Sequence, residues 1–193
     1  MGSGCVDKMR LQPLTALGGV EPARDVIGAV EIVENPGIAL ASLATRRGQG
    51  SAVAAAARAM GLGLPGPGMV SASAPCAALW LGPDQWMVMA QSASHEDLAA
   101  VLMAAFGAAA SVTEQTGGWV CFDLNGPALP DLFERLCAVD TRAMAVGRGT
   151  RTVIEHLGCY LICRAAGQFR VFGPRSSAAS LHHALTTAAR SIA

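Results

Sequence analysis

Four acidic residues are candidates for general acid-base chemistry: Asp84, Glu114, Asp123 and Asp140. Catalysis of this kind needs a titratable side chain within hydrogen-bond reach of the proton that it moves. The positions of these four residues along the chain do not indicate that any two of them meet. Asp84 is accounted for by a turn, where aspartate is common. The sequence therefore identifies no catalytic residue among its carboxylates.

The four histidines do not follow a metal-binding or catalytic spacing. His182 and His183 are neighbours on an expected helix, where successive side chains point about 100° apart, so they do not readily bind one ion. His156 is expected on a strand and His95 in an exposed helical turn. The chain contains neither an HExxH motif nor a GxSxG elbow. We predict no metal site and no serine nucleophile.

The six cysteines are scattered, and no two form a CxxC pair. The closest pair, Cys159 and Cys163, would lie about 13 Å apart in a strand, too far to share one zinc ion. Residues 1–5 lack the charged and apolar regions of a signal peptide. We therefore expect a cytoplasmic protein whose cysteines are thiols. The six positions are Cys5, Cys76, Cys121, Cys137, Cys159 and Cys163.

One segment, Gly61–Gly66, has the spacing GxGxxG. A dinucleotide-binding site needs a strand before this motif and a helix after it, so that backbone amides point at a pyrophosphate. Here an alanine-rich helix is expected before the motif, and Pro67 and Gly68 follow it. We interpret the segment as a linker, and the cofactor-binding residues remain unknown.

Charge is balanced along the chain, with 14 Lys and Arg against 14 Asp and Glu. Nucleic-acid binding rests on a basic patch, so the composition disfavours a nucleic-acid partner. The chain is nevertheless apolar, with 52% hydrophobic and 15% charged residues. Its longest apolar stretch, 98–110, is shorter than the roughly 20 residues of a membrane span, so we expect no membrane contact. Partner chains that cover part of the surface explain this composition, because obligate interfaces resemble a domain core.

A hairpin is the clearest structural element in the sequence. Two short apolar strands, 77–81 and 86–89, flank Gly82–Gln85, and proline at the second position of this segment predicts a type I turn. Apolar residues from Leu98 onward recur at helical spacing, with Ser94 as the expected N-cap. The same helical spacing recurs at 129–137 and 178–192.

The remaining strands are expected at 38–45, 111–114, 119–124, 152–156, 157–163 and 168–172, and a further helix at 51–60. This order predicts an α+β fold of two ferredoxin-like (split β-α-β) units with antiparallel sheets. We expect the helices to cover one face of each sheet and to leave the other face free to pack. The predicted division is an irregular N-terminal segment at 1–36, a first unit at 37–115 and a second unit at 116–193.

The segment Ala78–Trp86, with the sequence ALWLGPDQW, resembles the "LWLGPDEW" hairpin of heterotetrameric sarcosine oxidase gamma subunits. Four further segments resemble that family in the same order: Phe122–Pro127, Phe133–Asp140, Gly147–Ile154 and Pro174–Ala178. The similarity runs from about Gly37 to the C-terminus. The chain departs from the family at Ser177, where an aromatic residue is frequent, and at Gln115–Trp119.

The resemblance implies a fold related to the folate-binding domain of aminomethyltransferases. It also implies a cytoplasmic complex of alpha, beta, gamma and delta chains that oxidatively demethylates sarcosine to glycine. In such a complex FAD, FMN, NAD, tetrahydrofolate and zinc belong to the other subunits. This chain would then be a structural subunit that holds no cofactor and has no active site of its own.

Three alternatives remain open at this stage. The chain could be the equivalent subunit of a related N-methyl amino acid dehydrogenase, since such complexes use similar chains. It could be a folate-dependent one-carbon transferase, although those enzymes are longer and need an acidic residue to hold the pterin. An unrelated interaction module is the third alternative.

Overall fold

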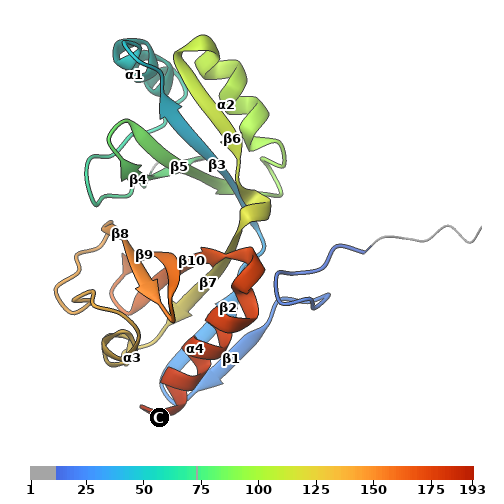
Figure 1. Cartoon of the computed structure of the whole chain (residues 1–193), viewed down its shortest axis with the longest axis vertical. Coiled ribbons are helices and arrows are strands. Elements are labelled where there is room, and N and C mark those ends of the chain that lie inside the picture. Colours follow the sequence, from blue (N-terminus) through green and yellow to red (C-terminus); the bar gives the residue numbers. More distant parts are fainter. Residues whose placement is uncertain (1–11, 73) are drawn as a thin grey trace, which may run out of the picture.

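The computed structural model describes residues 12–72 and 74–193, and within them the chain forms two antiparallel sheets and four α-helices (Figure 1). The smaller sheet has the order β4-β5-β3-β6 and contains β3 (Ile38–Thr45), β4 (Ala77–Gly82), β5 (Gln85–Gln91) and β6 (Ala110–Glu114). The larger sheet has the order β1-β2-β7-β10-β9-β8 and contains β1 (Arg24–Ile27), β2 (Val30–Glu34), β7 (Trp119–Asn125), β8 (Gly149–Ile154), β9 (Leu157–Ala165) and β10 (Gln168–Pro174). The predicted α+β class is confirmed.

The helices cover the outer face of each sheet (Figure 1). Helices α1 (Gly50–Ala59) and α2 (Leu98–Phe106) pack on the four-stranded sheet, and α3 (Leu129–Leu136) and α4 (Ala178–Arg190) pack on the six-stranded sheet. Short 3-10 turns are η1 (Gly107–Ala109), η2 (Thr116–Gly118) and η3 (Arg175–Ser177). The inner faces of the two sheets are therefore the faces that remain to pack against each other.

The alternation of side chains along β3 divides the core into layers. Ala39, Ala41 and Leu43 point toward α1 and α2, whereas Ile38 and Leu40 point toward the six-stranded sheet. This is the period of two that a strand imposes. Because both faces of the first half of β3 are covered, Ile38–Ala41 are all buried.

A second core lies between the six-stranded sheet and its helices. Phe122 and Leu124 of β7 are fully buried there against Leu129 and Phe133 of α3 and Leu181 of α4. The rings of Phe133 and Phe169 lie 5.2 Å apart in a tilted arrangement. Removing one such large side chain from water contributes about 1.5–3 kcal/mol, so this layer holds α3 and α4 on the sheet.

The prediction of an irregular segment at 1–36 is wrong for Arg24–Glu34. These residues form β1 and β2, a hairpin that joins the six-stranded sheet beside β7. The alternation of Val30 and Ile32 continues into Glu34, whose carboxylate occupies an inward position where an apolar residue is expected. Residues 1–11 of the predicted segment, including Cys5, lie outside the described residues.

Three local predictions need correction. Asp84 has a φ of +57°, which a type I turn does not allow at its third position and a type II turn requires. The N-cap of α2 is Asp97 rather than Ser94, whose hydroxyl donates to the carbonyl of Gln91 instead. The turn between β8 and β9 lies at Glu155 and His156, both with positive φ, as in a type I′ hairpin. His156 is thus a turn residue.

The linker prediction for Gly61–Gly66 is confirmed, because these residues form a loop between α1 and β4. Trp86 anchors this loop through a hydrogen bond of 2.9 Å from its indole Nε1 to the carbonyl of Pro65. The indole also packs beside the core under α1 and α2. The amides of Gly61 and Leu62 donate to the carbonyls of Arg58 and Ala57 at 3.1 and 2.9 Å, so they complete the end of α1.

We predict that Gly126→Ala lowers the free energy of unfolding by about 2–4 kcal/mol, because a Cβ atom at this position meets the backbone carbonyl of Ala29. Gly126 follows β7 with a φ of +138° and donates to the carbonyl of Gly167 at 2.9 Å. Urea denaturation followed by circular dichroism measures the change.

The matched control is Gly61→Ala, because Gly61 also has a positive φ, of +67°, but has open space around it. We expect a loss of about 1 kcal/mol there, from the backbone conformation alone. Equal losses for the two variants would contradict a crowded junction at Gly126.

Candidate functional site

The inner faces of the two sheets meet in an apolar contact, which we call the seam. Its buried residues come from both sheets and include Ile38, Leu40, Leu79, Met87, Met89, Cys121, Ile162 and Phe172. Trp119 and Tyr160 extend the contact, with ring centroids 5.4 Å apart. A site formed jointly by both halves of the fold must lie along this seam.

The chain crosses the seam twice, and hydrogen bonds hold both crossings. At the first crossing, the amide of Asn35 donates to the carbonyl of Cys121 at 2.8 Å. At the second, the hydroxyl of Thr116 accepts from the amide of Leu40 at 2.9 Å. The indole of Trp119 donates to the side-chain oxygen of Gln115 at 3.2 Å. Residues 115–119, which depart from the family pattern, therefore join the two sheets.

Polar side chains converge at one edge of the seam, and we call Asn35, Asp123, Arg164 and Arg170 the Asp123 cluster. Arg170 donates from Nε and Nη2 to the two carboxylate oxygens of Asp123 at 2.7 and 2.8 Å. Asn35 donates to Oδ2 at 2.7 Å, and Arg164 lies 3.1 Å from Oδ1. The side chains of Asp123 and Arg170 are 15% and 16% exposed, so this is a largely buried ion pair.

The cluster keeps Asp123 ionised. Burial by itself raises the pKa of this carboxyl, but the hydrogen bonds from Arg170 and Asn35 and the charges of both arginines outweigh it, so the pKa is lowered. The pKa of Arg170 is raised, because its bonds to Asp123 outweigh the effect of burial. Both oxygens of Asp123 already accept hydrogen bonds, and its proton affinity is low. Asp123 is therefore poorly suited to be a general base.

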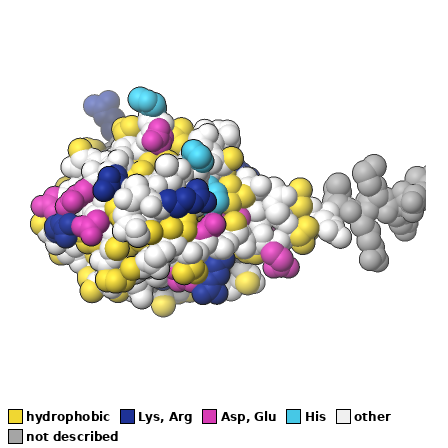
Figure 2. Space-filling view, turned by 90° about the horizontal axis from the view of Figure 1, so that it is seen from below, with side chains coloured by type: hydrophobic (Ala, Val, Ile, Leu, Met, Phe, Trp, Pro, Cys, Tyr) yellow, Lys and Arg dark blue, Asp and Glu magenta, His cyan; other side chains and the backbone are white. Residues whose placement is uncertain are grey.

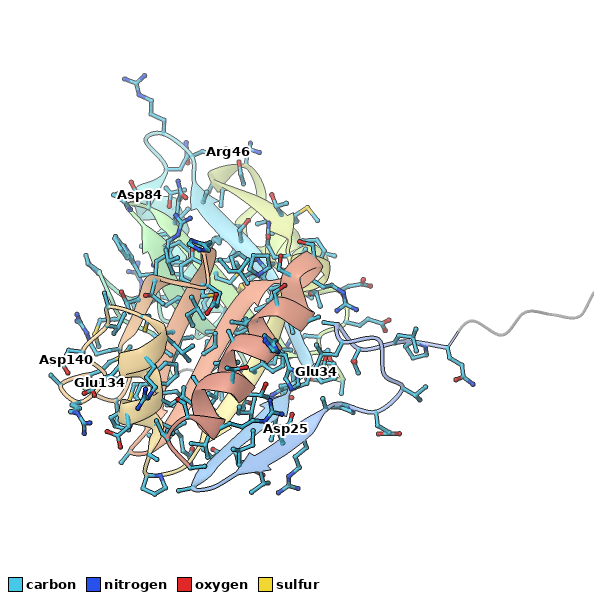
Figure 3. The ribbon with its side chains drawn as sticks, turned by 60° about the horizontal axis from the view of Figure 1, so that its bottom comes forward. Asp25, Glu34, Arg46, Asp84, Glu134 and Asp140 are labelled. Atoms are coloured by element: carbon cyan, nitrogen blue, oxygen red, sulfur yellow. The ribbon has the colours of Figure 1, made fainter. Side chains whose placement is uncertain are left out.

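The other three acidic candidates lie apart from Asp123 and serve local structure. Asp84 lies in the β4–β5 turn, and Asp140 lies apart from it, beside Glu134 of α3 (Figure 3). Glu114 accepts from the amide of Thr116 at 2.7 Å, and Asp140 accepts from the amides of Arg142 and Ala143. The structure does not bring these four carboxylates together.

Two further acidic residues make contacts that the sequence did not indicate. Glu34 is 2% exposed and accepts from the amides of Leu17 and Ala23 at 3.0 and 3.2 Å, which fastens the preceding loop to β2. Asp25 of β1 lies 2.7 Å from Nε2 of His182 on α4 (Figure 3). Both contacts secure the N-terminal hairpin.

Five cysteines lie within the described residues, and all five are free thiols, as predicted. Burial raises the pKa of the Cys159 thiol to about 11 and also raises that of Cys121. Such thiols are protonated at neutral pH and are weak nucleophiles. Among residues 12–72 and 74–193, no three His, Cys, Asp or Glu side chains are grouped so that they could hold a metal ion.

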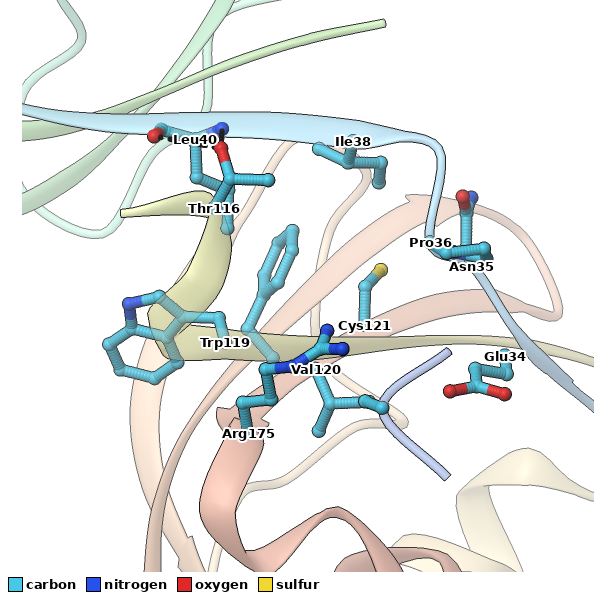
Figure 4. Close-up of a pocket in the computed structure, with 12 residues that line it drawn as sticks. Glu34, Asn35, Pro36, Ile38, Leu40, Thr116, Trp119, Val120, Cys121 and Arg175 are labelled. Atoms are coloured by element: carbon cyan, nitrogen blue, oxygen red, sulfur yellow. Dashed lines mark hydrogen bonds between the residues drawn. The ribbon is translucent and has the colours of Figure 1, made fainter. Parts of the chain in front are cut away.

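Two cavities lie along the seam. The smaller, of about 50 Å³, lies between Glu34, Thr116 and Arg175 and has room for little more than a water molecule (Figure 4). The larger, of about 240 Å³, lies on the side of Arg164 and Arg170. Only the larger cavity approaches the size of a ligand pocket, which is roughly 300–1,000 Å³.

Three members of the Asp123 cluster were not predicted from the sequence: Asn35, Arg164 and Arg170. A signal was present in the strand 168–172, where Phe169 and Val171 point toward the helices and Arg170 must point to the opposite face. A charged residue in the middle of an otherwise buried strand indicates a partner of opposite charge. The identity of that partner depends on strand order, which the sequence did not give.

The surface below the six-stranded sheet carries acidic, basic and histidine side chains among hydrophobic ones, with no large area of one sign (Figure 2). This distribution offers no continuous basic surface for a phosphate backbone. Within the described residues, no helix has the length and hydropathy that crossing a bilayer requires.

A protein-family model matches most of the chain. Residues 47–189 match the model described as "Sarcosine oxidase, gamma subunit family". A protein from Arthrobacter sp. named "Sarcosine oxidase subunit gamma" is 34% identical over 92 residues. That match covers 46% of this chain and 44% of the Arthrobacter protein, so it spans less than half the length of this curated relative.

Solved structures with a similar fold include a chain of a sarcosine oxidase and an aminomethyltransferase. A chain of the heterotetrameric sarcosine oxidase from Corynebacterium sp. U-96, in complex with pyrrole 2-carboxylate, superimposes with a TM-score of 0.76 at 25% identity. The match covers 86% of this chain and 87% of that one. The aminomethyltransferase T of the glycine cleavage system from Bartonella henselae gives a TM-score of 0.62 at 16% identity, covering 84% of this chain and 49% of that one. The second likeness concerns the fold alone.

We predict that Asp123→Asn lowers the free energy of unfolding at pH 7 by about 2–3 kcal/mol, because Arg170 keeps its charge and loses its carboxylate. The difference from the parent chain depends on pH in a defined direction. Because the folded pKa of Asp123 lies below its ordinary value of about 3.9, the stabilisation is complete above that value and is lost as the pH falls through the folded pKa. Chemical denaturation between pH 3 and pH 7 measures it.

Asp140→Asn is the matched control, because the amide oxygen still accepts from the same turn amides. Its expected effect is within about 0.5 kcal/mol at every pH. A difference between Asp123→Asn and the parent chain that stays constant down to pH 3 would contradict a lowered pKa of Asp123 in the folded chain.

Proposed function

Because this chain belongs to the sarcosine oxidase gamma subunit family, we propose that it is a structural, non-catalytic subunit of a heterotetrameric sarcosine oxidase. The observation that carries the proposal is the family match over residues 47–189, together with the superposition on a chain of the Corynebacterium enzyme over most of both chains. In this role the protein supports the oxidative demethylation of sarcosine to glycine, which other chains catalyse.

The placement of the acidic residues supports a non-catalytic role. Asp123 is ionised and engaged on both oxygens, and Asp84, Glu114 and Asp140 each serve a turn or strand end far from it. General acid-base work needs a titratable group free to exchange a proton with substrate. The contacts of these four carboxylates stabilise the fold and do not favour proton transfer to a substrate.

The surface of α2 supports a subunit role. This helix has the sequence LAAVLMAAF with no charged residue, and Val101 and Met103 on its outer side are 44% and 52% exposed. A helix that is apolar all round is typical of a buried position. In the proposed complex, alpha, beta and delta chains are the partners, and they hold the FAD, FMN, NAD, tetrahydrofolate and zinc. The proposed location is the cytoplasm.

We also propose that the two sheets are two ferredoxin-like units. The first, within 37–115, runs β3-α1-β4-β5-α2-β6 with the sheet order β4-β5-β3-β6, which is the split β-α-β arrangement. The second, within 116–193, supplies β7, β9 and β10 in a related order, and β2 takes the position of its fourth strand.

Two other functions are less well supported. A subunit of a related N-methyl amino acid dehydrogenase would share this fold, and only the substrate of the assembled complex distinguishes it. A folate-dependent one-carbon transferase has weaker support, because the likeness to aminomethyltransferase T covers 49% of that protein at 16% identity.

The test of this function is co-purification. We expect a tagged copy of the chain, expressed in its native host, to capture flavin-containing partners with visible absorption near 450 nm and sarcosine-dependent peroxide formation. The chain expressed alone should be colourless and inactive on sarcosine. The tag expressed alone controls for non-specific capture. Turnover of sarcosine by the isolated chain, or repeated failure to capture a flavoprotein, would refute the proposal.

A further inference from the structure

The larger cavity of the seam has an apolar wall. It lies between β4 and β5 of one sheet and β9 and β10 of the other, beside the loops at Val70 and Val146. Ala77, Met89 and Ile162 contribute side chains to the same wall. These residues give the cavity the composition of a small-molecule pocket, in which a few polar groups orient a mostly apolar ligand.

Arg164 and Arg170 provide the polar end of this cavity. A guanidinium group has five N–H donors. Arg170 uses Nε and Nη2 for Asp123, and Arg164 places Nη1 beside the same carboxylate. The described residues provide no acceptor for Nη1 of Arg170 or for Nε and Nη2 of Arg164. N–H donors of both arginines therefore remain without protein acceptors at the polar end of this cavity.

The net charge at the cavity is positive, which also favours an anionic ligand. Two arginines share the single carboxylate of Asp123, which leaves one net positive charge at the cavity. Arg170 is 16% exposed and Arg164 is 42% exposed, so one guanidinium is largely withdrawn from water and the other stays accessible. The unused donors of both arginines are open to an anion that enters the cavity, and a carboxylate is the group that matches a guanidinium fork best.

From this arrangement we infer that the cavity binds a small monocarboxylate with an apolar body. The carboxylate accepts from the unused donors of Arg164 and Arg170, and the apolar body lies against Met89, Val70 and Ile162. A cation is excluded by the two arginines. A dianionic phosphate fits less well, because one net positive charge and an apolar wall suit a monoanion. The volume of about 240 Å³ limits the ligand to a compact one.

This inference does not rest on the proposed function. It concerns a site within this chain, and the ligand series and the variants test it on the chain expressed alone.

The probe is benzoate, which combines a carboxylate with a compact apolar ring. Benzamide has the same shape without the charge, and acetate has the charge without the ring. Titration of the isotopically labelled chain is followed by amide chemical shifts, with Gly147 and Cys163 as reporters on the cavity wall. We expect benzoate to bind in the millimolar range that is typical of so small a ligand, and benzamide and acetate to bind at least fivefold more weakly.

Two variants locate the site. Arg164→Gln removes the accessible guanidinium while Asp123 keeps Arg170 and Asn35, and we expect it to weaken benzoate about fivefold to tenfold. Ala77→Leu fills the cavity without changing charge and should abolish the shifts at the reporters. Arg151→Gln is the matched control, an exposed arginine on neighbouring β8 outside the cavity wall, and should bind benzoate like the parent chain.

The result that overturns the inference is benzoate binding that is absent, no stronger than that of benzamide, or unchanged in Arg164→Gln. If Ala77→Leu does not fold, the Arg164→Gln variant and the comparison of benzoate, benzamide and acetate still test the inference. A carboxylate side chain of a neighbouring protein could also occupy the cavity. Benzoate binding retained in a complex purified with partner chains supports a free ligand, and benzoate excluded from that complex assigns the cavity to a partner side chain and overturns the inference.

Discussion

The apolar contact between the two sheets is the constraint on which the rest of the structure depends. Helices cover only one face of each sheet, so without the seam the side chains of Met87, Met89 and Phe172 would face water. The seam also determines where polar groups can stand. Asn35 and Thr116 lie at the two crossings between the sheets, where their side chains add hydrogen bonds to Asp123 and to the amide of Leu40.

The Asp123 cluster shows how a charged group is accommodated beside this apolar contact. A largely buried ion pair contributes little net stability compared with apolar residues, but loss of one partner is costly. The Asp123 cluster therefore favours one arrangement of the strands and adds little to the free energy of unfolding. It joins β7, β9 and β10 to the residue that leads from β2 into the four-stranded sheet, so the strand order of one sheet is coupled to the position of the other.

Periodicity and turn chemistry were sufficient to predict the α+β class, the four helices and most strands, because these features are local. Long-range features were not accessible in the same way. Glu34 interrupts the alternation of β2, and its partners, the amides of Leu17 and Ala23, are available only in the folded loop. Asp123 was one of four acidic candidates in the sequence, and its partner Arg170 lies 47 residues away. Only the strand order brings the two together.

The N-terminal hairpin has a consequence for how the protein is made. Strand β2 pairs with β7, and the whole four-stranded sheet is inserted between these two strands in the sequence. During synthesis, β2 emerges from the ribosome long before its neighbour and presents an unpaired edge while it waits. The four-stranded sheet can fold first, because its strands are contiguous in sequence. The six-stranded sheet is completed only later, after β7 to β10 have been synthesised. Strand pairings of such large sequence separation are slow to form. Until β7 is available, the exposed edge of β2 must therefore be kept from pairing with other chains.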